Sequence, residues 1–232
     1  MAHIVSAFDE DLVAIQAKLS EMGGLAEDVL ANALKSVQGR DSDLARRVID
    51  RDRAIDEMEH KVEECVVRVI ALRQPVAQDL RVLIAALKIA NVLERVGDLG
   101  KNIAKRAIPL SSAQPLKLTN SVVRMGRDTL TQLSDVLNAH ATRDVDLAVQ
   151  IWNRDVELDE LYNTIFREVV TYMVEDSRLI SQGAQLMFIA KNLERIGDHT
   201  TQIAEMIYYT VTGDSLGDDR PKGEPLGLAL QG

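Results

Sequence analysis

One acidic motif occurs twice in this chain of 232 residues, and its residue types are those of a metal site. ERVGD at 94–98 returns as ERIGD at 194–198, and an RDxxxDE segment precedes each copy, at 51–57 and at 154–160. On a helix, acids four residues apart lie on the same face. Carboxylate oxygens without cysteine suit hard or borderline cations, namely iron, manganese, magnesium, calcium or zinc. The repetition indicates a shared role, and metal binding is the chemistry that it favours.

These acids extend stripes of apolar residues that we expect to be buried. The stripes before the two ERxGD motifs contain Leu80, Leu83, Ile84 and Leu87, and Ile180, Ala184 and Met187. The stripes around the two RDxxxDE segments contain Ala45, Val48, Ile55, Val62, Val66 and Ile70, and Ala148, Ile151, Leu158, Ile165, Val169 and Met173. The helical periodicity therefore predicts that the carboxylates point inward and do not face solvent.

If the helices of each copy are neighbours, their carboxylates converge in two clusters. The predicted metal ligands are Asp52, Asp56, Glu94 and Asp98 in the first cluster and Asp155, Asp159, Glu194 and Asp198 in the second. The first copy also places Glu59 and Glu63 on the stripe, where the second has Tyr162 and Phe166. Acids gathered on an inward stripe are strongly unfavourable unless cations neutralise them.

Two structural interpretations compete with metal binding. In the first, neighbouring arginines neutralise the acids through bidentate ion pairs. The candidates are Arg51, Arg53, Arg95, Arg154 and Arg195. In the second, the helices are rotated so that the acids face water, as charged runs usually do.

The elements that must position these residues are long helices. The five prolines leave room for helices at about 8–38, 41–73, 76–108, 116–140, 142–175 and 178–211. We expect Asp41 or Ser42 to cap the second and Thr142 the fifth, and Gly39 and Gly213 to end helices. The pair Gly23 and Gly24 predicts a kink or a close contact in the first helix.

The chain is also an internal duplication. Residues 87–106 align with 187–206, so the second and third helices have counterparts in the fifth and sixth, and by elimination the first matches the fourth. The sequence predicts an all-α fold of two tandem, duplicated three-helix bundles, placed end to end or side by side. We expect the bundles at 1–110 and 111–213, and a disordered tail at 214–232 that is rich in glycine, proline and charge.

The composition excludes several classes of function. A net charge of −9 is unsuited to nucleic acid and to anionic membrane surfaces. The single cysteine, Cys65, rules out an internal disulfide. Neither a signal peptide nor a membrane-spanning segment is visible, so we expect a cytoplasmic protein without direct membrane insertion.

At these motifs the chain resembles the PhoU family, the phosphate-specific transport system accessory proteins. The resemblance rests on residues 72–106 and 192–205, on MGG at 22–24 and on the RDxxxDE segments, and it runs from about residue 8 to 211. It implies two three-helix bundles whose acid motifs, carried over to the eight positions above, hold multinuclear metal clusters of iron or zinc, alternatively manganese or magnesium. The first copy has Leu99 where the second has His199, so the two sites need not bind the same metal.

The resemblance further implies a cytoplasmic regulator of phosphate homeostasis. Such a protein represses the phosphate-starvation regulon and phosphate uptake by linking the ATPase subunit of the phosphate ABC transporter to a PhoR-type histidine kinase. We also expect a homodimer, the commonest symmetric assembly.

Two alternatives stay open. A carboxylate-bundle metalloenzyme would need Glu-x-x-His pairs, but Gly97 and Gly197 stand three residues after the motif glutamates, so we expect no enzyme. A plain helical scaffold, with its acids held in ion pairs, would bind no metal.

Overall fold

The computed structural model describes residues 2–51 and 53–217, with side chains from Ala7 onward, and within these residues it contains helices and no strand. The helices are α1 (Ala2–Gly39), α2 (Ser42–Arg51), α3 (Arg53–Arg73), α4 (Gln78–Ser112), α5 (Leu118–Thr142), α6 (Val145–Glu175), the short 3₁₀ helix η1 (Ser177–Leu179) and α7 (Ile180–Thr212). The predicted second helix corresponds to α2 and α3 on either side of residue 52. The predicted tail lies outside the described residues from 218 onward.

Local chemistry sets most helix ends. Asp41 caps α2, because its Oδ1 accepts hydrogen bonds from the backbone N–H groups of Asp43 (3.0 Å) and Leu44 (2.8 Å). The prediction that Thr142 caps the fifth helix is wrong. The cap of α6 is Asp144, which accepts from Leu147 N at 2.9 Å, whereas the Thr142 hydroxyl donates back to Asn138 O in α5.

Two further predicted helix ends are confirmed, and the end of α4 differs from the prediction. Gly213 ends α7 in the left-handed conformation, as expected, with φ of 86°. The helix α1 ends at Gly39, as expected, and Arg40 follows it in the left-handed conformation. The helix α4 runs past Pro109 to Ser112, because a proline in the last turn disrupts only one backbone hydrogen bond.

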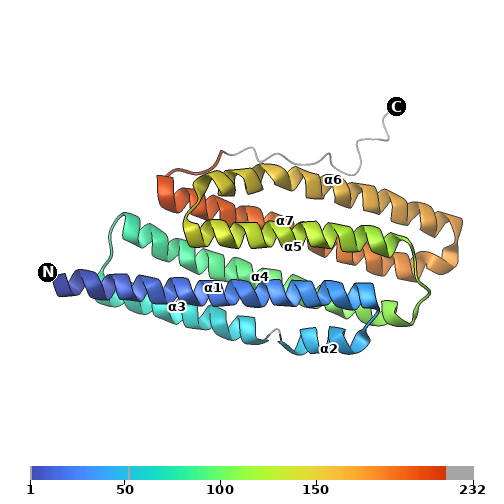
Figure 1. The fold of residues 1–232 in the computed structure, drawn as a ribbon, viewed down its shortest axis with the longest axis horizontal. Coiled ribbons are helices and arrows are strands. Elements are labelled where there is room, and N and C mark those ends of the chain that lie inside the picture. Colours follow the sequence, from blue (N-terminus) through green and yellow to red (C-terminus); the bar gives the residue numbers. More distant parts are fainter. Residues whose placement is uncertain (1, 52, 218–232) are drawn as a thin grey trace.

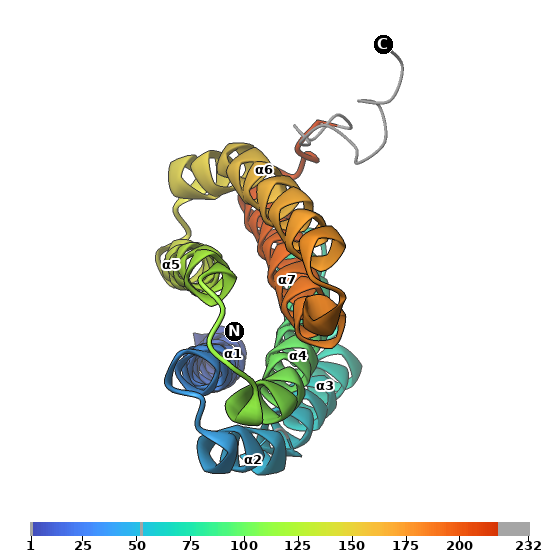
Figure 2. The ribbon, with the colours of Figure 1, turned by 90° about the vertical axis from the view of Figure 1, so that its right-hand side faces the viewer.

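The predicted fold is confirmed: α1 to α4 form one three-helix bundle, with α2 and α3 as one arm, and α5 to α7 form the other (Figure 1). The bundles lie side by side. Viewed along the helices, α3, α4, α7 and α6 follow one another on one side of the molecule, and α1 and α5 lie on the other (Figure 2). The bundles meet where α1 contacts α5 and where α4 contacts α7.

A reciprocal contact joins α1 to α5. A Cβ at Gly23 would lie 2.7 Å from Leu137 Cδ2, and a Cβ at Gly126 would overlap Leu34 Cδ2. The two contacts are related by one offset: Gly126 lies 103 residues after Gly23, and Leu137 lies 103 residues after Leu34. The two bundles therefore meet with approximate two-fold symmetry, in which each glycine receives the leucine of the other helix. Close packing, not a kink, explains Gly23, and it supports the pairing of the first helix with the fourth.

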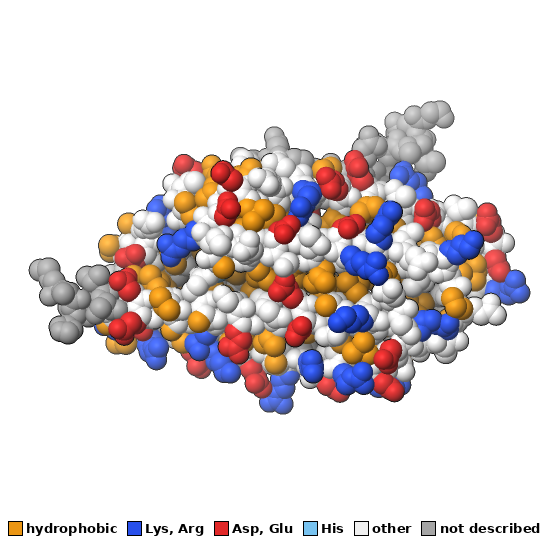
Figure 3. All heavy atoms as spheres, viewed as in Figure 1, with side chains coloured by type: hydrophobic (Ala, Val, Ile, Leu, Met, Phe, Trp, Pro, Cys, Tyr) orange, Lys and Arg blue, Asp and Glu red, His pale blue; other side chains and the backbone are white. Residues whose placement is uncertain are grey.

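Aliphatic side chains build the core, and most predicted stripe positions belong to it. Of the fully buried side chains, the largest include Met22, Leu30, Ile55, Leu83 and Ile151. The expectation fails for Leu80, Ile84 and Ile180, which are 37%, 38% and 51% exposed. They lie in the first two turns of α4 and α7. On the face that carries α1 and α5, charges of both signs are dispersed between apolar side chains (Figure 3).

Candidate metal centres on two helix seams

Two glycines bring the acidic helices together. A Cβ at Gly97 in α4 would lie 2.6 Å from Ile55 Cδ1 in α3. A Cβ at Gly197 in α7 would lie 2.8 Å from Asp155 Oδ1 and 2.9 Å from Leu158 Cδ1 in α6. The glycine of each ERxGD motif thus allows its helix to approach the RDxxxDE helix, which creates two equivalent contacts: the first seam (α3 with α4) and the second seam (α6 with α7).

The first seam gathers acidic side chains at one level. Burial raises the pKa of Glu94 above its usual value, and the negative charges of Asp98, Glu59 and Asp56 raise it further, against the opposing Arg95. Three of the predicted ligands, Asp56, Glu94 and Asp98, therefore interact, together with Glu59. Asp52 lies outside the described residues.

The acids of the first seam lie at the rim of the buried face, not in the core. The side chain of Glu94 is 18% exposed, and that of Asp98 is 41% exposed. The inward prediction is wrong for Glu63, whose side chain is 63% exposed and lies 3.9 Å from His60 Nδ1. The reason is that the stripe drifts around the helix, since 3.6 residues per turn do not repeat every four residues.

The second seam holds the most buried acid of the chain's described part. Asp155 is 1% exposed and accepts a hydrogen bond from Gln132 Nε2 at 3.2 Å, so α5 also takes part in this seam. Burial raises the pKa of Glu194, and the charges of Asp198 and Asp159 act in the same direction. Glu194, Asp198 and Asp159 therefore interact, and the fourth predicted ligand, Asp155, lies against Gly197 of the same seam. Sequence reasoning missed Gln132, for which the sequence holds no signal.

A lysine distinguishes the second seam from the first. Lys191 Nζ lies 2.7 Å from the Glu194 carboxylate and opposes the rise of its pKa. The same ammonium group lies 5.2 Å from the ring centroid of Tyr162. The first seam has Asn91 at the equivalent position, and its amide donates to Glu59 Oε1 at 3.2 Å. The spacing of three residues between Lys191 and Glu194 is a sequence signal that could have predicted this pair.

The arginines contribute less neutralisation than the first structural interpretation supposed. Arg95 lies 3.6 Å from Glu94, but Arg154 binds Asp135 in α5 at 2.6 Å, and Arg53 binds Glu57 at 3.1 Å. Lysines take the larger part, since Lys101 Nζ also lies 3.3 Å from Asp98 Oδ1. Rotation of the acids to full solvent exposure is contradicted by the burial of Asp155, Glu94 and Glu194.

His199 lies beside the second seam. Burial lowers its pKa, with Arg195 and Arg95 acting in the same direction against Gln202 and Asp198. Its Nδ1 lies 3.3 Å from Gln202 Oε1. The effect of Arg95 shows that α4 and α7 bring their motifs close to each other between the two seams.

In the part of the chain that the structure describes, no three His, Cys, Asp or Glu side chains stand ready to hold a metal ion. The donor set nevertheless fits a hard cation. Each seam supplies one glutamate whose pKa is raised by burial and by the charges of neighbouring acids, and a bound cation relieves both costs.

The fold and these seams define a class of protein: a duplicated helical bundle with an acidic seam in each copy. The family model of the PhoU domain matches residues 19–107 and again residues 122–207. The chain belongs to the PhoU family.

Relatives agree over nearly the whole length. A phosphate-specific transport system accessory protein PhoU homolog from Caulobacter vibrioides is 47% identical, over 95% of this chain and 96% of its own. The accessory protein PhoU of Escherichia coli K12 is 41% identical, over 91% and 88%. The crystal structure of PhoU from Pseudomonas aeruginosa aligns with a TM-score of 0.87 and 38% identity, over 89% of this chain and 100% of its own.

A more distant structure, the phosphate transport system regulatory protein PhoU from Streptococcus pneumoniae, has a TM-score of 0.84 and 28% identity, over 90% of this chain and 99% of its own. The names of these relatives support a role in phosphate transport, and the words accessory and regulatory suggest a protein that is not an enzyme. Within the described residues, no helix is both long and apolar enough to cross a bilayer.

Proposed function

We propose that this protein is a negative regulator of the phosphate-starvation regulon and of phosphate uptake. It acts at the cytoplasmic side as an adaptor between the ATPase subunit of the phosphate ABC transporter and a PhoR-type histidine kinase. Membership of the PhoU family, in both halves of the chain and over nearly its whole length, carries this proposal.

The metal part of the proposal rests on the raised pKa values of Glu94 and Glu194. Each is a buried or half-buried carboxyl among other acids, an arrangement that a cation stabilises. The first seam would hold metal through Asp52, Asp56, Glu94 and Asp98, and the second through Asp155, Asp159, Glu194 and Asp198. Iron, zinc, manganese and magnesium accept these oxygens. Bound metal would neutralise the seams and fix the distance between their helices.

Deletion of the chain in its own organism tests the regulatory role. In phosphate-rich medium, we expect a reporter of the phosphate-starvation regulon to rise and phosphate uptake to increase. Complementation with the wild-type chain should restore repression. A reporter that stays silent in a strain with no second copy of the family would contradict the proposal.

Purified components test the adaptor role. The full chain should bind both the transporter ATPase and the kinase in a pull-down, and the expected homodimer is measured in the same preparation by light scattering. Failure to bind either partner, with and without phosphate and nucleotide, would exclude an adaptor even if the reporter responds.

The pairs Lys101 with Asp98 and Lys191 with Glu194 favour a second candidate, a scaffold whose acids are neutralised by its own lysines. Elemental analysis distinguishes the two functions. A metal-binding regulator retains metal after gel filtration, and the scaffold contains none.

A further inference from the structure

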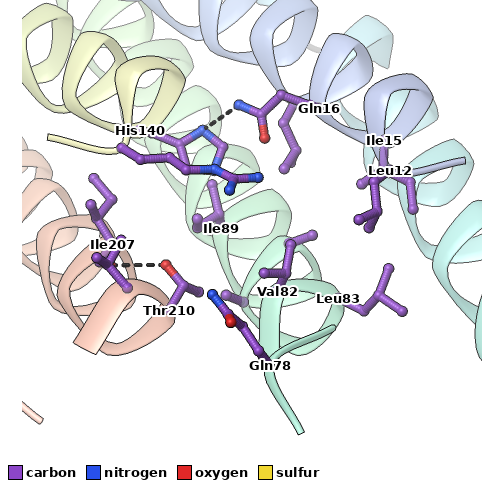
Figure 4. Close-up of a pocket in the computed structure, with 15 residues that line it drawn as sticks. Leu12, Ile15, Gln16, Gln78, Val82, Leu83, Ile89, His140, Ile207 and Thr210 are labelled. Atoms are coloured by element: carbon purple, nitrogen blue, oxygen red, sulfur yellow. Dashed lines mark hydrogen bonds between the residues drawn. The ribbon is translucent and has the colours of Figure 1, made fainter. Parts of the chain in front are cut away.

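A cavity of about 150 Å³ lies between the two bundles, and no residue of the acid motifs lines it. It is at the end of the molecule where α1 and α4 begin and α5 and α7 finish (Figure 1). Its walls are aliphatic and come from both bundles, and they include Leu12, Ile15, Leu83, Ile89 and Ile207. Figure 4 shows Gln16 and His140 at one edge and Gln78 and Thr210 at another, with Val82 and Ile89 between them.

The polar side chains of this cavity offer hydrogen-bond donors and one positive charge. Gln16 Nε2 lies 3.2 Å from His140 Nδ1. An amide nitrogen only donates, so Nδ1 accepts and the proton of the neutral imidazole is on Nε2. Gln78 adds a further amide, and Arg143 adds a guanidinium. In a chain with net charge −9, no Asp or Glu is among the described residues that line the cavity.

The opposite end of the molecule shows why Arg143 is significant. The shift of 103 residues that relates the bundles makes Arg40 the counterpart of Arg143, and both have left-handed backbones, with φ of 55° and 57°. Arg40 donates to the backbone oxygens of Ser111 and Ala113 and so ties the end of α1 to the end of α4. Within the described part of the chain, no hydrogen bond or ion pair holds the Arg143 side chain.

A second pair of equivalent residues also differs between the two ends of the molecule. The counterpart of His140 is Val37, which is 1% exposed in the core. At one end the duplication thus places an apolar side chain and an arginine bound to the backbone. At the other end it places an imidazole and an exposed arginine beside a cavity. Burial lowers the pKa of His140 to about 4, and the charge of Arg143 acts in the same direction. The imidazole is therefore neutral at pH 7 and donates without adding a second charge.

We propose that this cavity binds a small oxyanion, held by the Arg143 guanidinium and by N–H groups of His140, Gln16 and Gln78. The proposal is independent of the metal seams and of the adaptor role. Arg143 and His140 belong to the second bundle, and Gln16 and Gln78 to the first, so a bound anion would join the two. Phosphate and a short-chain carboxylate share the required chemistry, and the aliphatic walls would accommodate the hydrocarbon part of the carboxylate.

Histidine-labelled full-length protein, freed of metal with a chelator, tests the site by NMR at pH 7. We would titrate inorganic phosphate, butyrate and chloride at matched ionic strength. With phosphate or butyrate, the ring signals of His140 should shift saturably, whereas those of His60 and His199, which do not line the cavity, should not. The anion that shifts the His140 signals shows whether the site takes a phosphate or a carboxylate head group. Chelation prevents phosphate on seam metal from contributing.

Arg143→Gln should weaken the anion by about tenfold or more, the usual loss for a charge-assisted hydrogen bond. Arg124→Gln, the same change on an exposed part of α5, is the matched control and should bind like the wild type. Circular dichroism would verify that both variants fold. The proposal fails if neither anion shifts His140, if chloride shifts it equally, or if Arg143→Gln binds as tightly as the wild type.

Discussion

The two halves of this protein share a backbone plan but distribute charge differently. The first seam has half-buried acids and an asparagine, Asn91, where the second has Lys191 in contact with Glu194. The second seam also holds the fully buried Asp155, which accepts a hydrogen bond from Gln132. The ends differ as well, since Val37 and Arg40 close one and His140 and Arg143 line a cavity at the other. Duplication therefore preserved the geometry, and the side chains gave each copy its own electrostatics.

The largest effect should come from neutralising one seam. Replacing Asp52, Asp56, Glu94 and Asp98 with Asn or Gln removes the charges that would hold a cation, with little change of shape. Metal in the first seam should be lost completely, and metal in the second should stay. Elemental analysis measures this, with the equivalent change of the second seam as the reciprocal control. Metal content that equals the wild type in both variants would exclude the seams as sites.

Only the second half of the chain should show a strong effect of pH on stability, and His140 should cause this effect. Its folded pKa of about 4 is below the unfolded value of about 6.5, so the unfolded state binds the proton first. Stability should therefore fall as the pH drops from about 6.5 to about 4, by up to about 3 kcal/mol.

Urea unfolding at pH 7 and pH 5 measures this effect. His140→Gln should lose about 2 kcal/mol less than the wild type between these values, because glutamine does not titrate. Equal losses would show that folding does not lower the pKa of His140.

The two motif glycines should differ in their tolerance of a methyl group. Gly97→Ala presses on the flexible end of Ile55, but Gly197→Ala presses on the buried carboxylate of Asp155. Overpacking usually costs about 1–3 kcal/mol, and we expect Gly197→Ala at the upper end and Gly97→Ala at the lower. Thermal unfolding compares them. Gly24→Ala, with nothing within 4 Å, is the control and should be neutral or stabilising.

Exchanging the residues at positions 91 and 191 should reverse the difference in metal affinity between the two seams. Lys191→Asn removes the internal cation, so the second seam should bind Mn²⁺ about tenfold more tightly, and Asn91→Lys should weaken the first by a similar factor. Calorimetric titration of the chelator-treated protein measures both. If neither affinity changes, Lys191 does not compete with metal.

The smallest effect concerns the metal-free protein. Folding raises the pKa of Glu94, so stability is lost as the pH rises from the ordinary glutamate value through the folded one. Glu94→Gln should stabilise the metal-free protein at pH 7 by a few tenths of a kcal/mol, the usual size of repulsion between acids four residues apart. Glu194→Gln should gain less, since it also removes the ion pair with Lys191. Urea unfolding at pH 7 gives both values, and a destabilised Glu94→Gln would contradict the repulsion.

The helical periodicity and the residues that begin or end helices allowed most of the fold to be predicted. Prolines, the cap at Asp41 and Gly213 act within one turn of chain, so their effects can be read locally. The error at Thr142 is also local, since the nearby Asp144 competed for the same cap. The duplication, the fold class and the acid motifs needed only comparison of the chain with itself.

Burial and partnership were decided by the tertiary structure. Asp155 and Asp98 follow the same helical rule, but one is in the core and the other is 41% exposed, because a third helix covers only the first of them. The cavity beside His140 exists because two bundles lie side by side, an arrangement that the repeat left open. Sequence determined which side of each helix carries the acids, since that depends on period alone. Only the packing of distant helices determined which acids lose water and which cations reach them.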